Sequence, residues 1–334
     1  MNHIKFSTCL AVLLLAGCSM LSGGPTPRSY SQQDFRNFLN EVRLEAANKN
    51  ISEKTLAANL DNAEYLPKVV ELDYRQRGNF VPFRQYISSV LTDKKIADAN
   101  LFYHENLPLL RTVEKQYGVD AKAIVALWGM ESNFGRYMGN YNVVSSLATL
   151  AYDGRRGAFF RGELIDSLKI IDQGNIAGAD MKGSWAGAMG QSQFMPSTFL
   201  TYAVDEDNDG RRDIWGDKAD VFGSIANYLH SLGWKKNDGI CQKVTLPAGF
   251  DLKEANIKNE NTVGFWRAHG VKIIGDNGGN DSKVASIVNL EDNNSDILEG
   301  GDYYIVYDNY KKIMKWNRSL FFATSICMMA GDIE

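Results

Sequence analysis

The chain has 334 residues, of which 44% are hydrophobic and 23% charged, an ordinary composition for a soluble globular protein. A chain of this length is too long for one small hydrophobic core, which indicates roughly two or three packed lobes. A formal net charge of −4 excludes a nucleic-acid binder that relies on a basic excess.

The first 17 residues have the pattern of a bacterial export signal. Lys5 supplies a positive charge, and the apolar run 10–16 is too short to span a bilayer. The run ends in Leu15-Ala16-Gly17-Cys18, which resembles a lipobox, where the cysteine becomes a lipid-bearing N-terminus. A plain signal peptide with an incidental cysteine is the alternative. Ser19 stands where inner-membrane lipoproteins usually carry Asp, so we expect a lipid-anchored protein on the periplasmic face of the outer membrane.

Beyond the signal, a helical pattern fills most of the chain. Residues 18–30 are rich in Ser, Gly and Pro, which indicates a flexible tether. Phe35, Phe38, Leu39 and Val42 then recur at spacings of three and four, as on one face of a helix. Helical patterns continue to about residue 237, and helix returns from about residue 311.

Between these helical regions the sequence changes to short runs in which apolar and polar residues alternate. Residues 244–246, 284–290 and 303–307 are typical of strands, and polar turn clusters such as 276–281 separate them. We therefore predict a mainly α (α+β) protein with a small β-rich lobe. Its expected segments are a helical lobe at 31–110, a core at 111–238, the β-rich lobe at 239–302 and a C-terminal helical segment at 303–334.

Two cysteines, Cys241 and Cys327, remain after the signal cysteine Cys9 and the lipidation candidate Cys18 are set aside. An oxidising periplasm permits a disulfide between them, but sequence alone leaves the pairing open. Without partner histidines they indicate neither a zinc site nor thiol catalysis.

The segment 120–131 places an acid on an apolar helix face. Asp120 suits an N-cap, and Ile124, Leu127, Trp128 and Glu131 share one face. Burial and the nearby helix C-terminus should both raise the pKa of Glu131, so that it can protonate a glycosidic oxygen. The alternative is a structural pair between Glu131 and Arg136.

Two longer motifs resemble the lytic murein transglycosylase B family. Trp128-Gly129-Met130-Glu131-Ser132-Asn133-Phe134-Gly135 is similar to the family's catalytic motif, and 183–197, Gly-Ser-Trp-Ala-Gly-Ala-Met-Gly-Gln-Ser-Gln-Phe-Met-Pro-Ser, is similar to its cleft motif. The resemblance covers most of residues 31–330. It implies a lysozyme-like helical core with an added helical lobe and a β-rich lobe.

The resemblance also implies a chemistry with one carboxylate. Glu131 would protonate the leaving oxygen between MurNAc and GlcNAc in peptidoglycan glycan strands. It would then take the proton of the C6 hydroxyl, which closes a 1,6-anhydro ring. No organic cofactor and no second acid are needed, although ordinary glycosidases use two.

Further cleft residues are expected from the same resemblance. Ser184 and Gln193 offer a hydroxyl and an amide for N-acetyl groups, with local turn hydrogen bonding as the alternative. Tyr86, Tyr141 and Asn142 are further candidates for substrate binding. Asn317 lies in Trp316-Asn317-Arg318-Ser319, where the family usually reads Tyr-Asn, so the exact sugar contacts are open.

An acidic loop follows the second motif. Asp205, Asp207 and Asp209 occupy positions 1, 3 and 5 of an EF-hand-like calcium loop, Gly210 occupies position 6, and the peptide oxygen of Arg211 would serve at position 7. Position 12 is Gly216 rather than Glu. The family uses a longer loop, so Asp220 is the expected closing ligand of a structural Ca²⁺; a solvated turn is the alternative.

Two competing functions remain open at this stage. A lysozyme-type hydrolase would use Glu131 with water as nucleophile, and a lipid-anchored peptidoglycan-binding protein would have no catalysis. We expect a monomeric enzyme. The residues do not reveal endo- or exo-action, peptide-stem preference, partner proteins or the ion in the loop.

Overall fold

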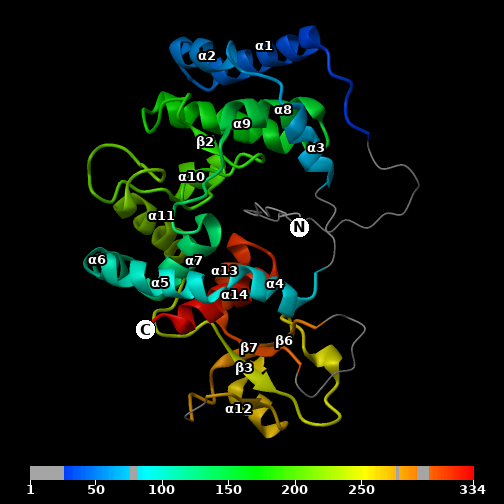
Figure 1. Cartoon of the computed structure of the whole chain (residues 1–334), viewed down its shortest axis with the longest axis vertical. Helices are drawn as coiled ribbons and strands as arrows, with labels where there is room; N and C mark the ends of the chain where they lie inside the picture. Colours follow the sequence, from blue (N-terminus) through cyan, green and yellow to red (C-terminus); the bar gives the residue numbers. More distant parts are fainter. Residues whose placement is uncertain (1–25, 76–80, 276–277, 292–300) are drawn as a thin grey trace, which may run out of the picture. The chain divides into compact units, whose positions relative to one another are not determined.

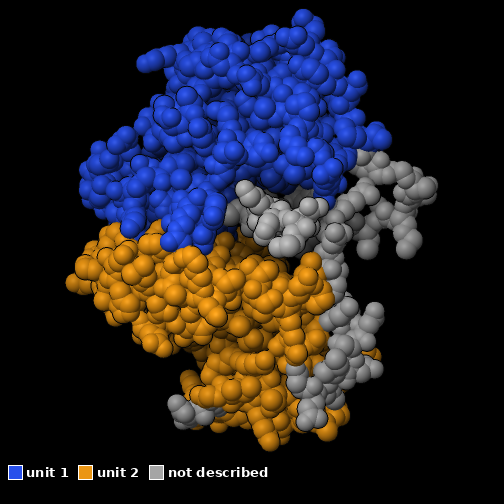
Figure 2. Space-filling model, viewed as in Figure 1, with its two compact units in different colours: residues 1–11, 15–79, 131–227 blue, residues 12–14, 80–130, 228–334 orange. Residues whose placement is uncertain are grey.

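A computed structural model of the protein describes residues 26–75, 81–275, 278–291 and 301–334. The export signal and Cys18 lie outside the described residues. The chain forms two compact units, coloured separately in Figure 2. Within the described part, unit 1 comprises 26–75 and 131–227, and unit 2 comprises 81–130 and the stretch from 228 onward.

The two units are interleaved along the sequence. One boundary falls between Met130 and Glu131, inside helix α7 (Ala121–Ser132), and another falls inside α11 (Lys218–Ser231). The lobes expected from sequence are instead consecutive segments, and their boundaries stay a prediction. In the described residues, no helix has both the length and the apolar character that a membrane span requires.

Unit 1 is built from helices around one buried helix, α8. Helix α8 is buried along its whole length and packs against α9, as Figure 1 shows. The predicted face of α1 is confirmed, since Phe35, Leu39 and Val42 are buried and Phe38 is half-buried. The helices of this unit, apart from the two that contain a boundary, are α1 (Gln32–Asn48), α2 (Glu53–Leu60), α3 (Pro67–Arg75), α8 (Val143–Asp153), α9 (Gly157–Asp172) and α10 (Pro196–Tyr202).

Contacts over long sequence separations complete this unit. The Asp172 carboxylate at the end of α9 accepts hydrogen bonds from the Ser52 amide at 3.2 Å and the Thr55 hydroxyl at 2.7 Å. These bonds fix the start of α2. A two-stranded antiparallel ribbon of β1 (Tyr141–Asn142) and β2 (Lys182–Gly183) pairs Tyr141 with Gly183.

Unit 2 combines helices with the predicted sheet, whose strand order is β4-β6-β7-β3-β5 with antiparallel neighbours. The strands predicted at 244–246, 284–290 and 303–307 are confirmed with small shifts at their ends. The strands are β3 (Cys241–Thr245), β4 (Asn261–Thr262), β5 (Lys272–Ile273), β6 (Val284–Asn289) and β7 (Tyr303–Val306). The helices are α4 (Phe83–Val90), α5 (Asp93–Glu105), α6 (Leu107–Tyr117), the 3-10 turn η1 (Leu252–Glu254), α12 (Val263–Ala268), α13 (Asp308–Trp316) and α14 (Leu320–Asp332).

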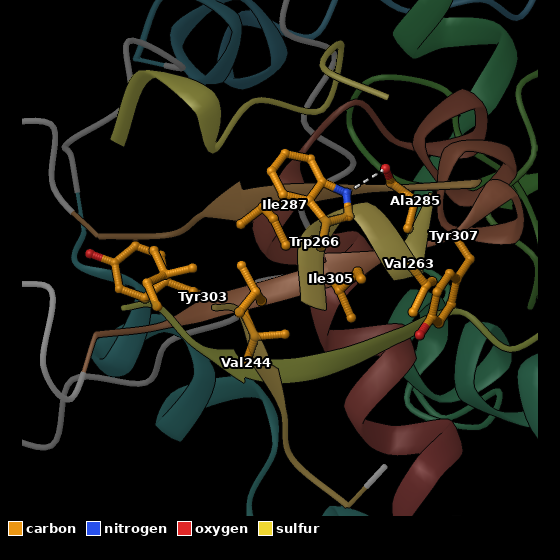
Figure 3. Packing of buried hydrophobic residues seen from close by; sticks show 10 residues of the cluster. Val244, Val263, Trp266, Ala285, Ile287, Tyr303, Ile305 and Tyr307 are labelled. Carbon is orange, nitrogen blue, oxygen red and sulfur yellow. Dashed lines mark hydrogen bonds between the residues drawn. The ribbon is translucent and has the colours of Figure 1, made fainter. Parts of the chain in front are cut away.

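One face of the sheet has its own apolar core, drawn in Figure 3. Trp266 of α12 packs among Val244, Ile287 and Ile305 from the three central strands. Its indole N–H donates to the carbonyl of Ala285 at 3.0 Å, so this buried polar group keeps a partner. The small lobe is therefore held by its own packing.

A disulfide joins Cys241 of β3 to Cys327 of α14, with their Cα atoms 5.9 Å apart. The pairing that the sequence left open is thus defined by the fold. The bond closes a loop with a sequence separation of 86 residues and connects the sheet to the last long helix.

Replacing both cysteines, Cys241→Ser with Cys327→Ser, should lower the free energy of unfolding by about 2–4 kcal/mol, because the unfolded chain loses a cross-link. Denaturant unfolding with and without reductant measures the effect. Reductant should bring the wild type to the level of the variant and leave the variant unchanged. Equal stability of both proteins without reductant would reject the stabilising role.

Candidate active site

Helix α7 carries the acid that the sequence singled out. Its apolar face is confirmed, because Ile124, Leu127 and Trp128 are at most 1% exposed. Glu131 in the last turn is 7% exposed, so the carboxyl group is buried with them. At the other end the Asp120 carbonyl accepts the amide of Ala123 at 2.9 Å. The Asp120 carboxylate accepts from Trp234 at 2.8 Å, so its side chain anchors a neighbouring turn.

A sharp turn ends this helix one residue after Glu131. Asn133, Phe134 and Gly135 have φ of 51°, 60° and 80°, three successive residues in the left-handed region. The Ser132 hydroxyl accepts the amide of Gly135 at 3.0 Å, and the Ser132 carbonyl accepts that of Tyr137 at 2.8 Å. Non-glycine residues adopt this conformation at a cost, and such strain is concentrated at functional sites. The predicted turn is confirmed.

The second motif packs against this turn. The Gln193 side-chain amide donates to the carbonyl of Met138 at 3.1 Å and to that of Gly190 at 2.9 Å. A Cβ on Gly139 would lie 2.0 Å from the carbonyl oxygen of Gly183. The second motif therefore contacts the loop that directly follows the first motif, within unit 1.

The other predicted cleft residues of unit 1 have structural bonds. The Ser184 hydroxyl accepts the Ala188 amide at 3.0 Å, the local turn bond that was the alternative for this residue. Asn142 caps α8 by accepting the Ser145 amide at 2.9 Å, and its NH₂ group donates to Gly178 at 3.0 Å. Tyr141 is half-buried in the ribbon. Roles in substrate binding stay predictions for all of these residues.

Tyr86 and Asn317 belong to unit 2, whereas Glu131, Ser184, Gln193, Tyr141 and Asn142 belong to unit 1. The Tyr86 ring lies 5.6 Å from that of Phe321. Asn317 ends α13 and is 8% exposed, and its side-chain oxygen accepts the Ser319 amide at 3.1 Å. The proposed sugar contacts of these two residues also stay predictions.

Gln191 was not assigned a role from sequence, although it lies in the second motif. Its side-chain amide donates to the Trp215 carbonyl at 2.8 Å, and its Oε1 faces Gly135, where a Cβ would lie only 2.4 Å away. Gln191 thus links the turn after Glu131 to the loop that contains Trp215. The signal available in the sequence was a glycine in the first motif, but its partner could be found only in three dimensions.

The acidic loop gathers its three aspartates. Asp205, Asp207 and Asp209 each bring one carboxylate oxygen within 4.8 Å of the others. The amide of Asp209 donates to Asp205 at 3.0 Å and to Asp207 at 3.1 Å, which curls the loop around them. This donor set fits a hard cation such as Ca²⁺.

Asp220, the expected closing ligand, is 1% exposed. One of its oxygens accepts the Glu206 amide at 2.7 Å, and the other accepts the Asp213 amide at 2.5 Å. Burial raises its pKa to about 6, against the lowering effect of these two bonds. Asp220 therefore fastens both ends of the loop, and ligation of an ion by its carboxylate stays a prediction.

A family model, the transglycosylase SLT domain, matches residues 34–331 of this chain. The chain belongs to the SLT family of transglycosylases. This SLT chain is 31% identical over 255 residues to membrane-bound lytic murein transglycosylase B of Escherichia coli K12. That match covers 75% of the chain and 66% of the relative, just under two thirds of its length.

Solved structures share the fold. SltB3 from Pseudomonas aeruginosa in complex with NAG-NAM-pentapeptide has a TM-score of 0.84 at 36% identity, over 90% of the SLT chain and 79% of SltB3. Its complex with NAG-anhNAM-pentapeptide gives 0.83 at 37% identity, over 89% and 78%. Escherichia coli Slt35 in complex with calcium gives 0.74 at 27% identity, over 90% and 92%. The expected family and the lysozyme-like, mainly α fold are confirmed.

Replacing Gly139 by Ala tests the contact between the second motif and the loop after the first motif. Gly139→Ala should lower the free energy of unfolding by about 2–5 kcal/mol, because left-handed strain and a clash with backbone add together. The matched control is Gly174→Ala, also at positive φ in unit 1 but with nothing within 4 Å of the new Cβ. The control should lose only about 1–2 kcal/mol. Thermal or denaturant unfolding measures both, and equal losses would contradict the close approach.

Proposed function

We propose that this protein is a lytic transglycosylase that cleaves the β-1,4 bond between MurNAc and GlcNAc and leaves a 1,6-anhydroMurNAc end. The observation that carries the proposal is the buried Glu131 at the end of α7, beside a turn held by the second motif. The SltB3 complexes with NAG-NAM-pentapeptide and NAG-anhNAM-pentapeptide support the same substrate and product.

Glu131 acts as acid and then as base. It gives its proton to the oxygen that leaves C1 of MurNAc, and the C1–O bond breaks. The N-acetyl oxygen of the same sugar stabilises the positive charge at C1. The C6 hydroxyl then attacks C1 and returns its proton to Glu131, so no water and no second acid are consumed.

Glu131→Gln should reduce the release of anhydro-muropeptides from purified sacculi by about 10²–10⁴-fold, since a positioned acid and base contributes that much. Mass spectrometry of the released fragments measures this loss. Products with free reducing ends from the wild type would favour a lysozyme-type hydrolase. No cleavage at all by the wild type would favour a binding protein.

The matched control is Glu163→Gln. Glu163 is another buried acid of unit 1, 5% exposed, and it accepts hydrogen bonds from the Ser197 amide at 2.9 Å and hydroxyl at 2.7 Å. This variant should keep its activity when the folded fraction is matched by circular dichroism. If both variants lose activity equally, the assignment of Glu131 as catalyst does not hold.

A structural calcium ion in the acidic loop forms the second part of the proposal. Asp205, Asp207 and Asp209, the peptide oxygen of Arg211 and the carboxylate of Asp220 would hold it. Their clustering supports this, as does the calcium complex of Slt35. The ion would neutralise like charges and tie α10 to α11, with no part in the chemistry.

Calcium should raise the melting temperature of the wild type, and a chelator should lower it. At about 100 times the dissociation constant, calcium adds about 2.7 kcal/mol of stability. Asp207→Asn should abolish most of this gain. Glu206→Gln removes an acid from the same loop but outside the aspartate cluster, so the gain should persist. If neither calcium nor the chelator changes the melting temperature of the wild type, the proposed binding of an ion is rejected.

The proposed location is the periplasmic face of the outer membrane, with a monomeric chain held by lipid on Cys18 after removal of the signal 1–17. The lipobox-like sequence supports the anchor, and the Escherichia coli relative is membrane-bound.

A further inference from the structure

Unit 2 contains a cavity of about 440 Å³ that the proposed chemistry does not use. It lies where the turn after α11, the approach to β4 and β6, and the first turn of α13 come together. Its volume falls within the range of about 300–1,000 Å³ that is usual for small-ligand sites. Six of its nine lining residues are charged: Lys235, Asp238, Glu260, Lys283, Asp308 and Lys311.

These charges form three pairs of opposite sign around the cavity. Lys235 lies 3.3 Å from Asp308, Lys283 lies 3.3 Å from Asp238, and Lys311 pairs with Glu260. In each pair at least one side chain is more than one quarter exposed, so its charge can reach a ligand. The lining is therefore rich in both signs, with no net charge.

The framework behind these charges is rigid. The side chain of Asn309, which is fully buried, accepts the Lys235 amide at 2.9 Å and donates to the Lys235 carbonyl at 2.8 Å. The Lys283 ammonium lies 3.4 Å from the centre of the Tyr307 ring, a cation–π contact. A site whose charged groups are already held in place loses little entropy on binding.

The balance of charges selects the ligand class. A neutral sugar could bond to Asn280 and Ser282, which also line the cavity, but it would leave three pairs of charges without a charged partner in the ligand. A polyanion would meet three carboxylates, and a polycation would meet three lysines. A ligand with both a carboxylate and an ammonium group satisfies both sets, and exposed Val284 offers an apolar contact to a small side chain.

We propose that this cavity binds the peptide stem of peptidoglycan through the free carboxylates and amino group of the peptide. The inference rests on the proposed function, since a peptidoglycan substrate brings such a peptide with it. SltB3 has been crystallised with a sugar ligand that carries a pentapeptide.

Calorimetry of the full chain with the free pentapeptide stem, without sugars, tests this proposal. Lys235→Ala with Lys311→Ala should weaken binding by at least about tenfold, because a hydrogen bond to a charged group is worth that much. The control is Lys312→Ala: Lys312 pairs with the same Asp308 at 3.5 Å but does not line the cavity. The control should bind like the wild type.

A second measurement needs no variant and so does not depend on the fold of one. The peptide is used with its N-terminus blocked, as it is in peptidoglycan, and acetylation of its side-chain amino group should weaken binding to the wild type about tenfold for the same reason. The proposal is overturned if the wild type does not bind the peptide, if acetylation changes nothing, or if the double variant binds as tightly as the control.

The failure of this site can be told apart from failure of the proposed function. Peptide-free glycan strands should be cut equally by the double variant and the wild type, while sacculi that carry peptides should be cut more slowly by the variant. If the protein binds the peptide but releases no anhydro sugar, the proposed enzymatic activity is refuted and the proposed peptide site is not. A chain that cuts both substrates and binds no peptide would refute the site alone.

Discussion

Moving a carboxyl group out of water costs free energy, and the surrounding structure must hold it there. This cost applies to Glu131, which is buried at the end of α7, a helix whose other residues are almost all buried. The helix ends one residue later, where the chain enters three left-handed residues. The second motif contacts this turn through Gln191, whose Oε1 faces Gly135, and contacts the loop after the turn through Gln193 and Gly183. Glu131, the strained turn after it and the second motif are therefore parts of one connected structure.

Local patterns in the sequence could predict the parts of this structure but not its assembly. The spacing of Ile124, Leu127 and Trp128 placed Glu131 on a buried face, and alternation placed the strands β3, β6 and β7, because both patterns reflect burial within one element. The two family-like motifs indicated which segments matter. Nothing in the sequence showed that Gln191 faces Gly135, since that contact joins segments more than fifty residues apart.

Other features of the fold could not be predicted from the sequence. The pairing of Cys241 with Cys327 requires two Cα atoms to approach across 86 residues. Asp220 is expected to bind an ion, which stays a prediction, and the structure adds that both its oxygens accept backbone amides of the loop, which the spacing of acids cannot reveal. Asn142 is expected near sugar, which also stays a prediction, and the structure adds that its side chain caps α8. In both of these residues a polar side chain bonds to backbone amides, as buried polar groups generally must find partners.

The interleaving of the two units has a consequence during protein synthesis. The helices α1, α2 and α3 leave the ribosome early, but their partners α8 and α9 follow only after residue 142. Until then the apolar face that includes Phe35 and Leu39 has α2 beside it but lacks the cover that α8 and α9 provide. A nascent chain therefore keeps part of this face exposed over this interval, so holding chaperones have a defined target at its N-terminal end.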